Sequence, residues 1–396
     1  MIETVPIWTY AEINPTTPEF KVIADGTELS YMPLEAIWPG GRADYSNFLL
    51  WPPKQNYTQF RRGDILVPKI TPTFEAGRAI VANIPSTLGL SSTEVHIVRP
   101  NRSTDPRYLQ YCFQSLPFLD EGAHSLRGVG NLRRITPLFL QNHKVLRATV
   151  DTQRTIADYL DRETGRIDAM IAKLDDMTET LSIRRASEIE TFTTRLPKPF
   201  TRMAFCGNVA LGKTYQGEKK NDGEILVNYV RAASLQSNGL ELDDQRMWMT
   251  VDDLDKYDLK RGDVLIVEGG AGFGRSVVLK EDMPGWGFQN HVIRVRPNRN
   301  YDGRFLDYCV KGHYSDGLIN ILAEGATIPG FSSEKTRNLP IADLSLEEQI
   351  HIADHLDEAT SKIDAMLAKV TELKSLLIER RSALITEVVT GRKAVV

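Results

Sequence analysis

The sequence predicts an α+β fold in two similar halves, each a mixed α/β module followed by one long helix. The main observation is a repeat: the 22 positions from Gln153 to Leu174 align without a gap with Gln349 to Val370, and 13 of them are identical. Shorter matches precede these segments in the same order in both halves. A repeat that spans half of a chain indicates a duplicated structural unit. We therefore expect a pseudo-twofold internal repeat.

The shorter matches carry the repeat through the modules, and the sequences between them differ. The matches are Arg62–Val67 with Arg261–Ile266, Val98–Arg102 with Val295–Arg299, Asp105–Cys112 with Asp302–Cys309, and Glu121–Ala123 with Glu324–Ala326. We expect four segments: module one at 1–150, a long helix at 151–196, module two at 197–344 and a second long helix at 345–396. Because loops on a shared scaffold usually carry binding specificity, the divergent stretches are the expected recognition loops.

Within each module we expect strands and one short helix. Runs rich in β-branched residues lie between Pro and Gly residues, as is typical of strands. The expected strands are 64–67, 79–82 and 95–99 in module one and 264–267, 276–279 and 291–295 in module two. The expected short helices are 105–116 and 302–312.

The two long helices carry apolar residues at alternating steps of three and four, which is the pattern of a coiled coil. The residues expected to pack in the seam are Ile156, Leu160, Ile167, Met170, Leu174, Leu181, Ile352, Leu356, Ile363, Met366, Val370 and Leu377. At about 39 and 45 residues, each helix needs a partner for its apolar stripe. We expect the two to pack antiparallel and to separate the modules. Pairing with a different protein is the alternative.

The ends of both helices can be read from the sequence. Ser345–Glu348 is a capping box for the second helix, and Asp151 or Thr152 can cap the first. Pro197 and Pro199 follow the first helix, and Gly391 follows the second.

The composition indicates an intracellular globular protein. At 396 residues, 41% hydrophobic and 25% charged, the chain is ordinary for a soluble protein of two or more domains. No apolar run approaches the roughly 20 residues of a membrane helix, and Met1–Thr4 does not begin a signal peptide. Cys112 and Cys309 occupy equivalent positions and are expected to be small core residues. We expect a cytoplasmic protein with no membrane partner.

The net charge of −4 is not that of a protein that binds nucleic acid through charge alone. Module one carries +2 and module two −1. If the chain binds DNA, basic groups must gather on one face, or partners must supply some of the phosphate contacts.

The segment Gly207–Thr214 matches the phosphate-loop pattern GxxxxGK[ST]. That site needs a helix directly after the loop, and the residues that follow, 215–223, are a poor helix. A turn that opens module two is the favoured interpretation, and a nucleotide site stays as the alternative.

Other motifs indicate structure more than chemistry. Gly270–Arg275 follows an expected strand and precedes another, which favours a hairpin connection over a dinucleotide site. His351 and His355 have the spacing of a zinc pair but no third ligand, so solvent-facing or partner-facing roles are favoured. No catalytic constellation, metal site or cofactor is expected.

Taken together, the motifs resemble the DNA-specificity subunit of type I restriction–modification systems. The stretch Leu339–Asp357 is similar to that family's entry into its long helix, and Ala383–Gly391 is similar to its C-terminal ending. Arg261–Ile266 with Gly274-Arg275 looks like a target-recognition-domain core, and Gly212–Tyr215 like the opening of such a domain. The resemblance covers essentially the whole chain.

The resemblance implies that each module is a target recognition domain that reads one half of a bipartite, asymmetric site in double-stranded DNA. It implies that the helices dock two methyltransferase subunits, to which motor-nuclease restriction subunits add. It also implies that the chain itself is not an enzyme. Module one departs from the pattern, because Pro68–Arg78 stands where a glycine-rich segment is expected.

Base recognition in the major groove uses Arg, Lys, Asn and Gln. The candidate DNA contacts are Lys69 and Arg78 in module one and Lys213, Gln216, Lys219, Lys220, Arg275 and Asn290 in module two. Arg61, Arg62 and Arg261 begin strands, and a role in fold stability is favoured for them. Two other functions stay open: a phosphate-loop nucleotide-binding protein, and a coiled-coil adaptor that does not bind DNA.

Overall fold

The computed structural model describes residues 3–130, 132–236, 239–270, 272–323 and 330–395. The repeat match at Glu324–Ala326 lies outside these residues. Contacts divide the chain into two compact units, one formed by Met1–Asp175 with Thr371–Val396 and the other by Asp176–Val370. Each unit therefore contains one module and one stretch of each long helix. We describe each unit by itself.

Module one is built on two four-stranded sheets. The first has the order β2-β11-β8-β9 and is antiparallel throughout. The second has the order β6-β3-β10-β7, with β3 and β10 parallel. The strands are β2 (Ala11–Ile13), β3 (Glu28–Met32), β6 (Phe48–Leu50), β7 (Thr58–Arg61), β8 (Ile65–Pro68), β9 (Ile80–Val81), β10 (Leu88–Ser91) and β11 (Val95–Pro100).

The helices of module one cover the first sheet and connect it to the long helices. They are α1 (Pro106–Phe113), α2 (Leu116–Ser125) and α3 (Pro137–Asn142). Two further strand pairs are antiparallel: β4 (Ile37–Trp38) with β5 (Arg42–Ala43), which form a small hairpin, and β1 (Thr4–Pro6) with β12 (Lys144–Leu146). Ile65 and Val98 of the sheet and Leu109 of α1 are fully buried in one core. That core continues into Leu160 and Ile385 of the long helices, so module and helices share one apolar interior.

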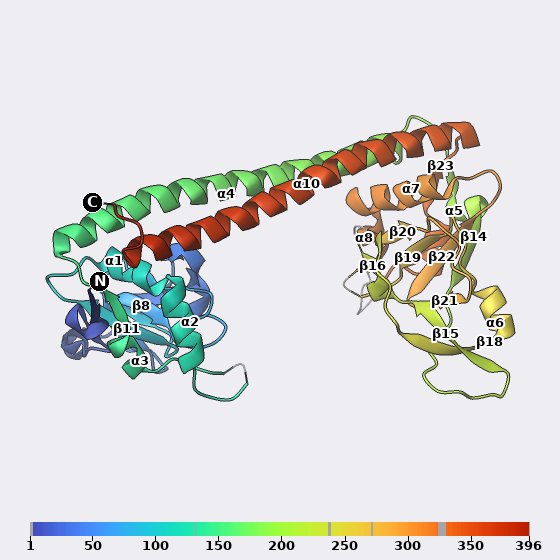
Figure 1. Ribbon diagram of the computed structural model, residues 1–396. Coiled ribbons are helices and arrows are strands. Elements are labelled where there is room, and N and C mark those ends of the chain that lie inside the picture. The colour runs from blue at the N-terminus through green and yellow to red at the C-terminus, as the bar shows by residue number, and fades with distance from the viewer. Residues whose placement is uncertain (1–2, 131, 237–238, 271, 324–329, 396) are drawn as a thin grey trace. The chain divides into compact units, whose positions relative to one another are not determined.

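Module two repeats this plan in the same chain order (Figure 1). Its first sheet has the order β14-β22-β19-β20, and its second has the order β18-β15-β21, with β15 and β21 parallel. The strands are β13 (Phe200–Arg202), β14 (Gly207–Leu211), β15 (Glu224–Val230), β16 (Leu235–Gln236), β17 (Gly239–Leu240), β18 (Arg246–Thr250), β19 (Val264–Val267), β20 (Ser276–Val278), β21 (Trp286–Phe288), β22 (Val292–Pro297) and β23 (Pro340–Ala342). The helices are α5 (Met203–Cys206), α6 (Val251–Lys256), α7 (Gly303–Ser315), α8 (Leu318–Ala323) and α9 (Ser333–Arg337).

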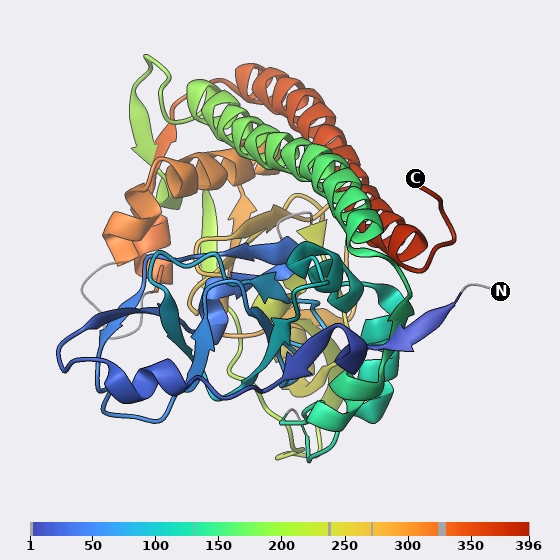
Figure 2. The ribbon, with the colours of Figure 1, turned by 90° about the vertical axis from the view of Figure 1, so that its left-hand side faces the viewer.

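The long helices are α4 (Val150–Phe192) and α10 (Leu346–Val389), and they pack together antiparallel. In the first unit, Arg381 Nε of α10 lies 3.0 Å from Asp168 Oδ1 of α4. In the second unit, Arg185 Nε of α4 lies 2.9 Å from Asp364 Oδ1 of α10. Figure 2 shows the C-terminal end of α10 beside the N-terminal end of α4. The predicted fold class is confirmed. In the described part of the chain, no helix is long and apolar enough to cross a membrane.

Most of the expected seam residues are buried, some of them against the modules: Ile156 and Leu160 lie in the core of module one, and Leu356 packs with Tyr308 of module two. Ile156, Leu160, Ile167, Leu181, Leu356, Ile363, Val370 and Leu377 are buried, and Leu174 and Ile352 are partly buried. Met170 and Met366 are instead 53% and 46% exposed. Two helices that pack with no third helix bury only the side chains along their line of contact. Met170 and Met366 lie beside this line and stay partly open to solvent.

The capping box of the second helix is confirmed. Ser345 N donates to Glu348 Oε2 at 2.9 Å, and Glu348 N donates to Ser345 Oγ at 3.3 Å. The expected cap of the first helix is wrong, because α4 begins at Val150 and Thr152 N donates to Thr149 Oγ1 at 3.3 Å. Gly391 follows α10 with a φ of 73°, as expected of a residue that ends a helix.

Candidate nucleic-acid interface

A buried glutamine ties each module to its long helix in the same way. The Gln153 side chain accepts a hydrogen bond from Asp105 N at 2.9 Å and donates one to Ala148 O at 2.9 Å. Gln349 makes the equivalent bonds with Asp302 N at 3.0 Å and Leu344 O at 2.9 Å. Both glutamine residues are fully buried. Each therefore pairs with two backbone groups at the junction of module and helix, and one bond in each unit is fully buried.

An arginine and a tyrosine complete each connection. In the first unit, Arg107 Nη1 lies 2.8 Å from Asp158 Oδ1 and 2.7 Å from Asp161 Oδ2, and Tyr111 OH donates to Asp161 Oδ1 at 2.7 Å. Thr164 Oγ1 is 3.2 Å from the same hydroxyl. Burial raises the pKa of Tyr111, so its hydroxyl keeps the proton that it donates.

The second unit repeats this arrangement bond for bond. Arg304 Nη1 lies 2.7 Å from Asp354 Oδ1 and 2.9 Å from Asp357 Oδ2, and Tyr308 OH donates to Asp357 Oδ1 at 2.7 Å. We call the two sets the joint residues: Asp105, Arg107, Tyr111, Gln153, Asp158, Asp161 and Thr164 in the first unit, and Asp302, Arg304, Tyr308, Gln349, Asp354, Asp357 and Thr360 in the second. Sequence comparison identified most of them as repeat matches but gave them no role.

The repeated Arg-Gly-Asp segment is a structural turn. Arg99 binds Asp64 through Nε and Nη2, each at 2.8 Å, and Arg296 binds Asp263 through the same atoms at 2.8 and 2.7 Å. The glycine before each aspartate has a φ near 88°, a backbone conformation that favours glycine. Arg62 Nε donates to Ser86 O at 3.1 Å, which fits the favoured role in fold stability.

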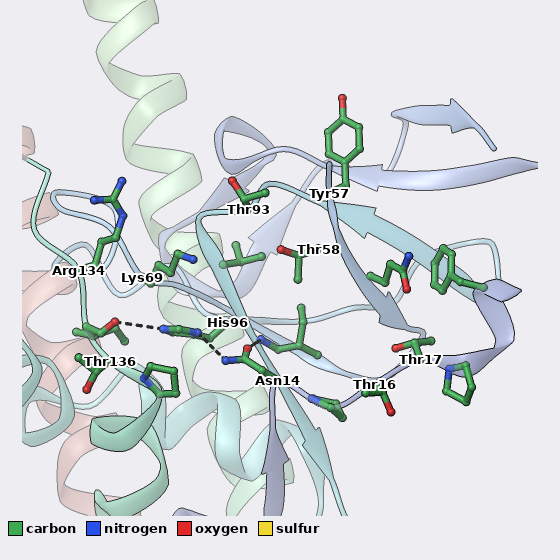
Figure 3. Close-up of a pocket in the computed structure, with 18 of the residues that line it drawn as sticks. Asn14, Thr16, Thr17, Tyr57, Thr58, Lys69, Thr93, His96, Arg134 and Thr136 are labelled. Atoms are coloured by element: carbon green, nitrogen blue, oxygen red, sulfur yellow. Dashed lines mark hydrogen bonds between the residues drawn. The ribbon is translucent and has the colours of Figure 1, made fainter. Parts of the chain in front are cut away.

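A cleft of about 1180 Å³ opens between the two sheets of module one (Figure 3). Its described lining residues include four basic side chains and no carboxylate: Lys21, Lys69, Arg127 and Arg134. Tyr57, Gln59 and several threonines add hydrogen-bonding groups. The cleft therefore combines positive charge with polar side chains suited to DNA. Of these residues, the sequence predicted Lys69.

The floor of the cleft is fixed by a hydrogen-bonded histidine. Asn14 Nδ2 donates to His96 Nδ1 at 3.1 Å, and His96 Nε2 donates to Ile135 O at 3.2 Å (Figure 3). Ile97 N donates to Asn14 Oδ1 at 3.0 Å, which sets the orientation of the amide. Burial lowers the pKa of His96, and its two bonds match the neutral ring. Asn14 has a φ of 50°, which is uncommon for a residue other than glycine.

Two of the expected DNA contacts brace the modules internally. Arg78 Nη1 donates to Ile37 O at 3.3 Å, and Arg275 Nη1 donates to Leu235 O at 2.9 Å. Both arginines stand at the same point of the repeat, and each holds the small hairpin of its own module, β4–β5 or β16–β17. Their guanidinium groups are therefore partly used within the fold.

The other contacts expected in module two lie near one polar loop. Glu224 accepts hydrogen bonds from Gln216 Nε2 and Lys220 N, both at 2.7 Å, and these bonds lower its pKa to about 2. Lys219 lies 3.9 Å from Asp222 and over the ring of Trp248. The Lys219 and Lys220 side chains are exposed. The loop thus presents two lysines on a backbone that Glu224 holds in place.

Lys213 and Asn290 lie together at the end of β14. Lys213 Nζ lies 2.5 Å from Asp253 Oδ2, and the lysine side chain is 19% exposed. Asn290 N donates to Lys213 O at 2.9 Å. The lysine therefore already has a carboxylate partner within its module.

The structure contradicts both interpretations of Gly207–Thr214, the favoured turn and the alternative phosphate loop. Gly207–Leu211 is strand β14, paired antiparallel with β22 along its whole length. Gly212 N and Lys213 N donate to the carbonyls of Val292 and Phe288. These amides are used in the sheet and cannot converge on a phosphate.

The remaining sequence motifs have structural roles. The segment between β19 and β20 connects two antiparallel strands, which confirms the predicted hairpin. His355 Nε2 lies 2.9 Å from Glu188 Oε1 on the partner helix, and its ring packs on Phe192. Cys112 and Cys309 are buried in the cores, as predicted.

Comparison with known proteins shows which proteins this chain resembles. No protein-family model matches the chain. The type I restriction enzyme EcoAI specificity subunit of Escherichia coli is 32% identical over 139 residues, 34% of this chain and 23% of that protein. The EcoEI specificity subunit of the same organism is 29% identical over 141 residues, 35% of this chain and 24% of that protein. The matched part thus spans about a quarter of these curated relatives.

Solved structures are similar over nearly the whole chain. A chain of the type I R-M system has a TM-score of 0.78 at 16% identity and covers 99% of this chain and 98% of its own. The HsdS subunit from Thermoanaerobacter tengcongensis has a TM-score of 0.57 at 16% identity, with 99% and 97% covered. The predicted resemblance to the specificity subunits of type I restriction–modification systems is therefore confirmed, in sequence over about a third of the chain and in fold over nearly all of it.

Proposed function

We propose that this chain is the DNA-recognition subunit of a type I restriction–modification complex. Each module reads one half of a bipartite, asymmetric site in double-stranded DNA, and the long helices join the two modules. The chain performs no reaction itself. It directs methyltransferase subunits, and with them motor-nuclease restriction subunits, to their site.

The duplicated joint is the observation that carries this proposal. The joint residues are identical in type in both units, whereas the modules that they hold differ in loops and charge. Fixed joints with unlike modules suit a protein that must present two different surfaces to one rod-like ligand. The basic cleft of module one and the lysine loop of module two supply groups that bind phosphates and base edges.

The outer faces of the helices suit partner proteins. Along α4 and α10, several large apolar side chains are about half exposed: Met170, Met177, Ile183, Met366, Leu373, Leu376 and Ile378. Rows of exposed apolar side chains of this kind are typical of surfaces that bind other proteins. We assign them to the docking of two methyltransferase subunits, one beside each module.

The test is selection from a randomised DNA duplex pool, with the full chain alone and with its methyltransferase subunit. We expect enrichment of one split motif, with binding that weakens as salt increases. A methylation map of cells that carry both genes should show the same motif, modified in both halves. A coiled-coil adaptor that does not bind DNA would give no enrichment under either condition, and that result would overturn the proposal.

A further inference from the structure

The same point of the repeated scaffold carries opposite charges in the two modules. Lys69 directly follows β8 in module one, and Glu268 directly follows β19 in module two. Their offset of 199 positions equals that between Asp64 and Asp263, so the two residues are equivalent in the repeat.

Backbone hydrogen bonds establish this equivalence in three dimensions. Lys69 N donates to Glu94 O at 3.0 Å, and Lys69 O accepts from Ile135 N at 2.9 Å. In module two, Glu268 N donates to His291 O at 3.0 Å, and Glu268 O accepts from Phe331 N at 2.6 Å. Because the side-chain direction in a strand follows its register, both side chains leave the sheet toward the same face.

In module one, that face is the wall of the basic cleft, and Lys69 is available there. Figure 3 shows Lys69 near Thr93 and Arg134. Arg134 binds both oxygens of the nearby Glu94, at 2.8 and 3.0 Å. Within the described residues, Lys69 Nζ has no hydrogen bond or ion pair and acts on the nearby Glu94 through its charge alone, so an unbonded ammonium faces the cleft.

In module two, Glu268 is similarly placed and only loosely paired. Its side chain is 25% exposed, and His291 Nδ1 lies 3.9 Å from its Oε2 atom. Burial raises the pKa of Glu268, against the opposing effect of His291. Asn290 stands next to His291 and is equivalent to Thr93 of the cleft in module one. The carboxylate can therefore accept hydrogen bonds from a ligand at this edge.

We propose that Lys69 and Glu268 are equivalent base-reading residues with opposite hydrogen-bonding character. Lys69 donates to O6 and N7 of a guanine in one half-site, and Glu268 accepts from the N4 amino group of a cytosine in the other. This inference rests on the proposed function and extends it to single positions of the DNA site. The same scaffold position would then select guanine when it holds a lysine and cytosine when it holds a glutamate.

The test uses the full chain in complex with its methyltransferase subunit and the same randomised duplex pool. Lys69→Ala and Glu268→Gln should each abolish the preference at one base pair of one half-site, with a loss of about 5- to 150-fold for the wild-type base. The remaining base pairs of the same half-site should keep their preference, which shows that the mutated module is folded, and the other half-site should be unchanged. The reversals Lys69→Glu and Glu268→Lys should change the preferred base at that position from guanine to cytosine and from cytosine to guanine.

Matched controls separate base reading from loss of charge. Lys144→Gln and Glu281→Gln remove the same charges from exposed positions elsewhere in each module and should leave the motif unchanged. An unchanged motif in the Lys69 and Glu268 variants would overturn the inference and leave the proposed function intact. A uniform loss of affinity for all sequences would overturn it too, since phosphate contacts behave in that way. Failure of the wild-type complex to enrich any sequence would overturn the proposed function itself.

Discussion

The joint in the first unit gives a quantitative prediction for Gln153→Ala. The Gln153 side chain is fully buried and bonds to Asp105 N and Ala148 O, both at 2.9 Å. Alanine leaves the buried Asp105 amide without a partner, whereas Ala148 O keeps the hydrogen bond that Tyr10 OH donates at 3.1 Å. A buried polar group left unpaired costs about 1–3 kcal/mol, so the local loss should be ~1–3 kcal/mol.

Hydrogen exchange measures this loss where it occurs. The Asp105 amide is itself the donor to Gln153, so peptides that cover 105–113 report on the bond directly. A loss of about 2 kcal/mol should accelerate exchange there by about 30-fold, if these amides exchange through local opening. The equivalent peptides that cover 302–310 should keep the wild-type rate, because Gln349 still holds Asp302.

Two controls make this prediction sharp. Gln349→Ala should give the mirror result, with fast exchange at 302–310 and wild-type exchange at 105–113. Gln245→Ala, at an exposed position, should change neither segment. Exchange at 105–113 within threefold of wild type in Gln153→Ala would refute the reasoning, as would an equal acceleration in both units.

Three further predictions follow from the structure. Burial lowers the pKa of His96 and of His143, so the unfolded chain binds protons near pH 6.5 that the folded module one does not bind. Below that pH, the free energy of unfolding of module one should fall by up to ~1.4 kcal/mol per pH unit for each histidine. In urea unfolding, a His96→Gln, His143→Gln variant should show a weaker dependence of this free energy on pH. Glu224→Ala should accelerate hydrogen exchange across 216–224 and weaken DNA binding by the complex, while the melting temperature of the rest of the chain stays unchanged. Equilibrium titration should detect no ATP binding to wild type or to Lys213→Ala. Thermal unfolding should show that Lys213→Ala loses on the order of 1 kcal/mol of folding stability, because the ion pair with Asp253 is removed. ATP affinity that depends on Lys213 would contradict the assignment of β14 as a strand.

The architecture could be predicted because its signals are local and occur twice. The heptad pattern and the capping box of the second helix depend on residues within a few turns of one helix, and the repeat predicted the partner of each helix. Met170 and Met366 show the limit of that reasoning. The pattern places them in the seam, yet how far a seam extends sideways depends on whether a third helix is present.

The candidate interface was harder to predict, because its residues come from distant positions. Lys21, Gln59, Arg127 and Arg134 line one cleft only after the two sheets of module one are assembled. The phosphate-loop match failed for the converse reason. Gly207–Thr214 has the right residues, but hydrogen bonds to β22 use its amides. The difference between Lys69 and Glu268 is visible in the sequence, at the same offset of 199 positions that separates Asp64 from Asp263.

The joint residues are the same in both units, whereas Lys69 and Glu268 differ, and this contrast fits the proposal that one scaffold serves two recognition tasks. The joint residues fix each module on its long helix, so a change in their hydrogen bonds would move a whole module. Both copies keep the same residue types at similar distances, such as 2.7 Å from each tyrosine hydroxyl to its aspartate. In the proposed function, Lys69 and Glu268 determine only which base edge fits, and they differ in charge while their backbone hydrogen bonds are equivalent. Exchange of one whole module should therefore change one half of the DNA site and leave the other half intact. Methylation maps of such exchanged chains would contradict this view if both halves of the motif changed together.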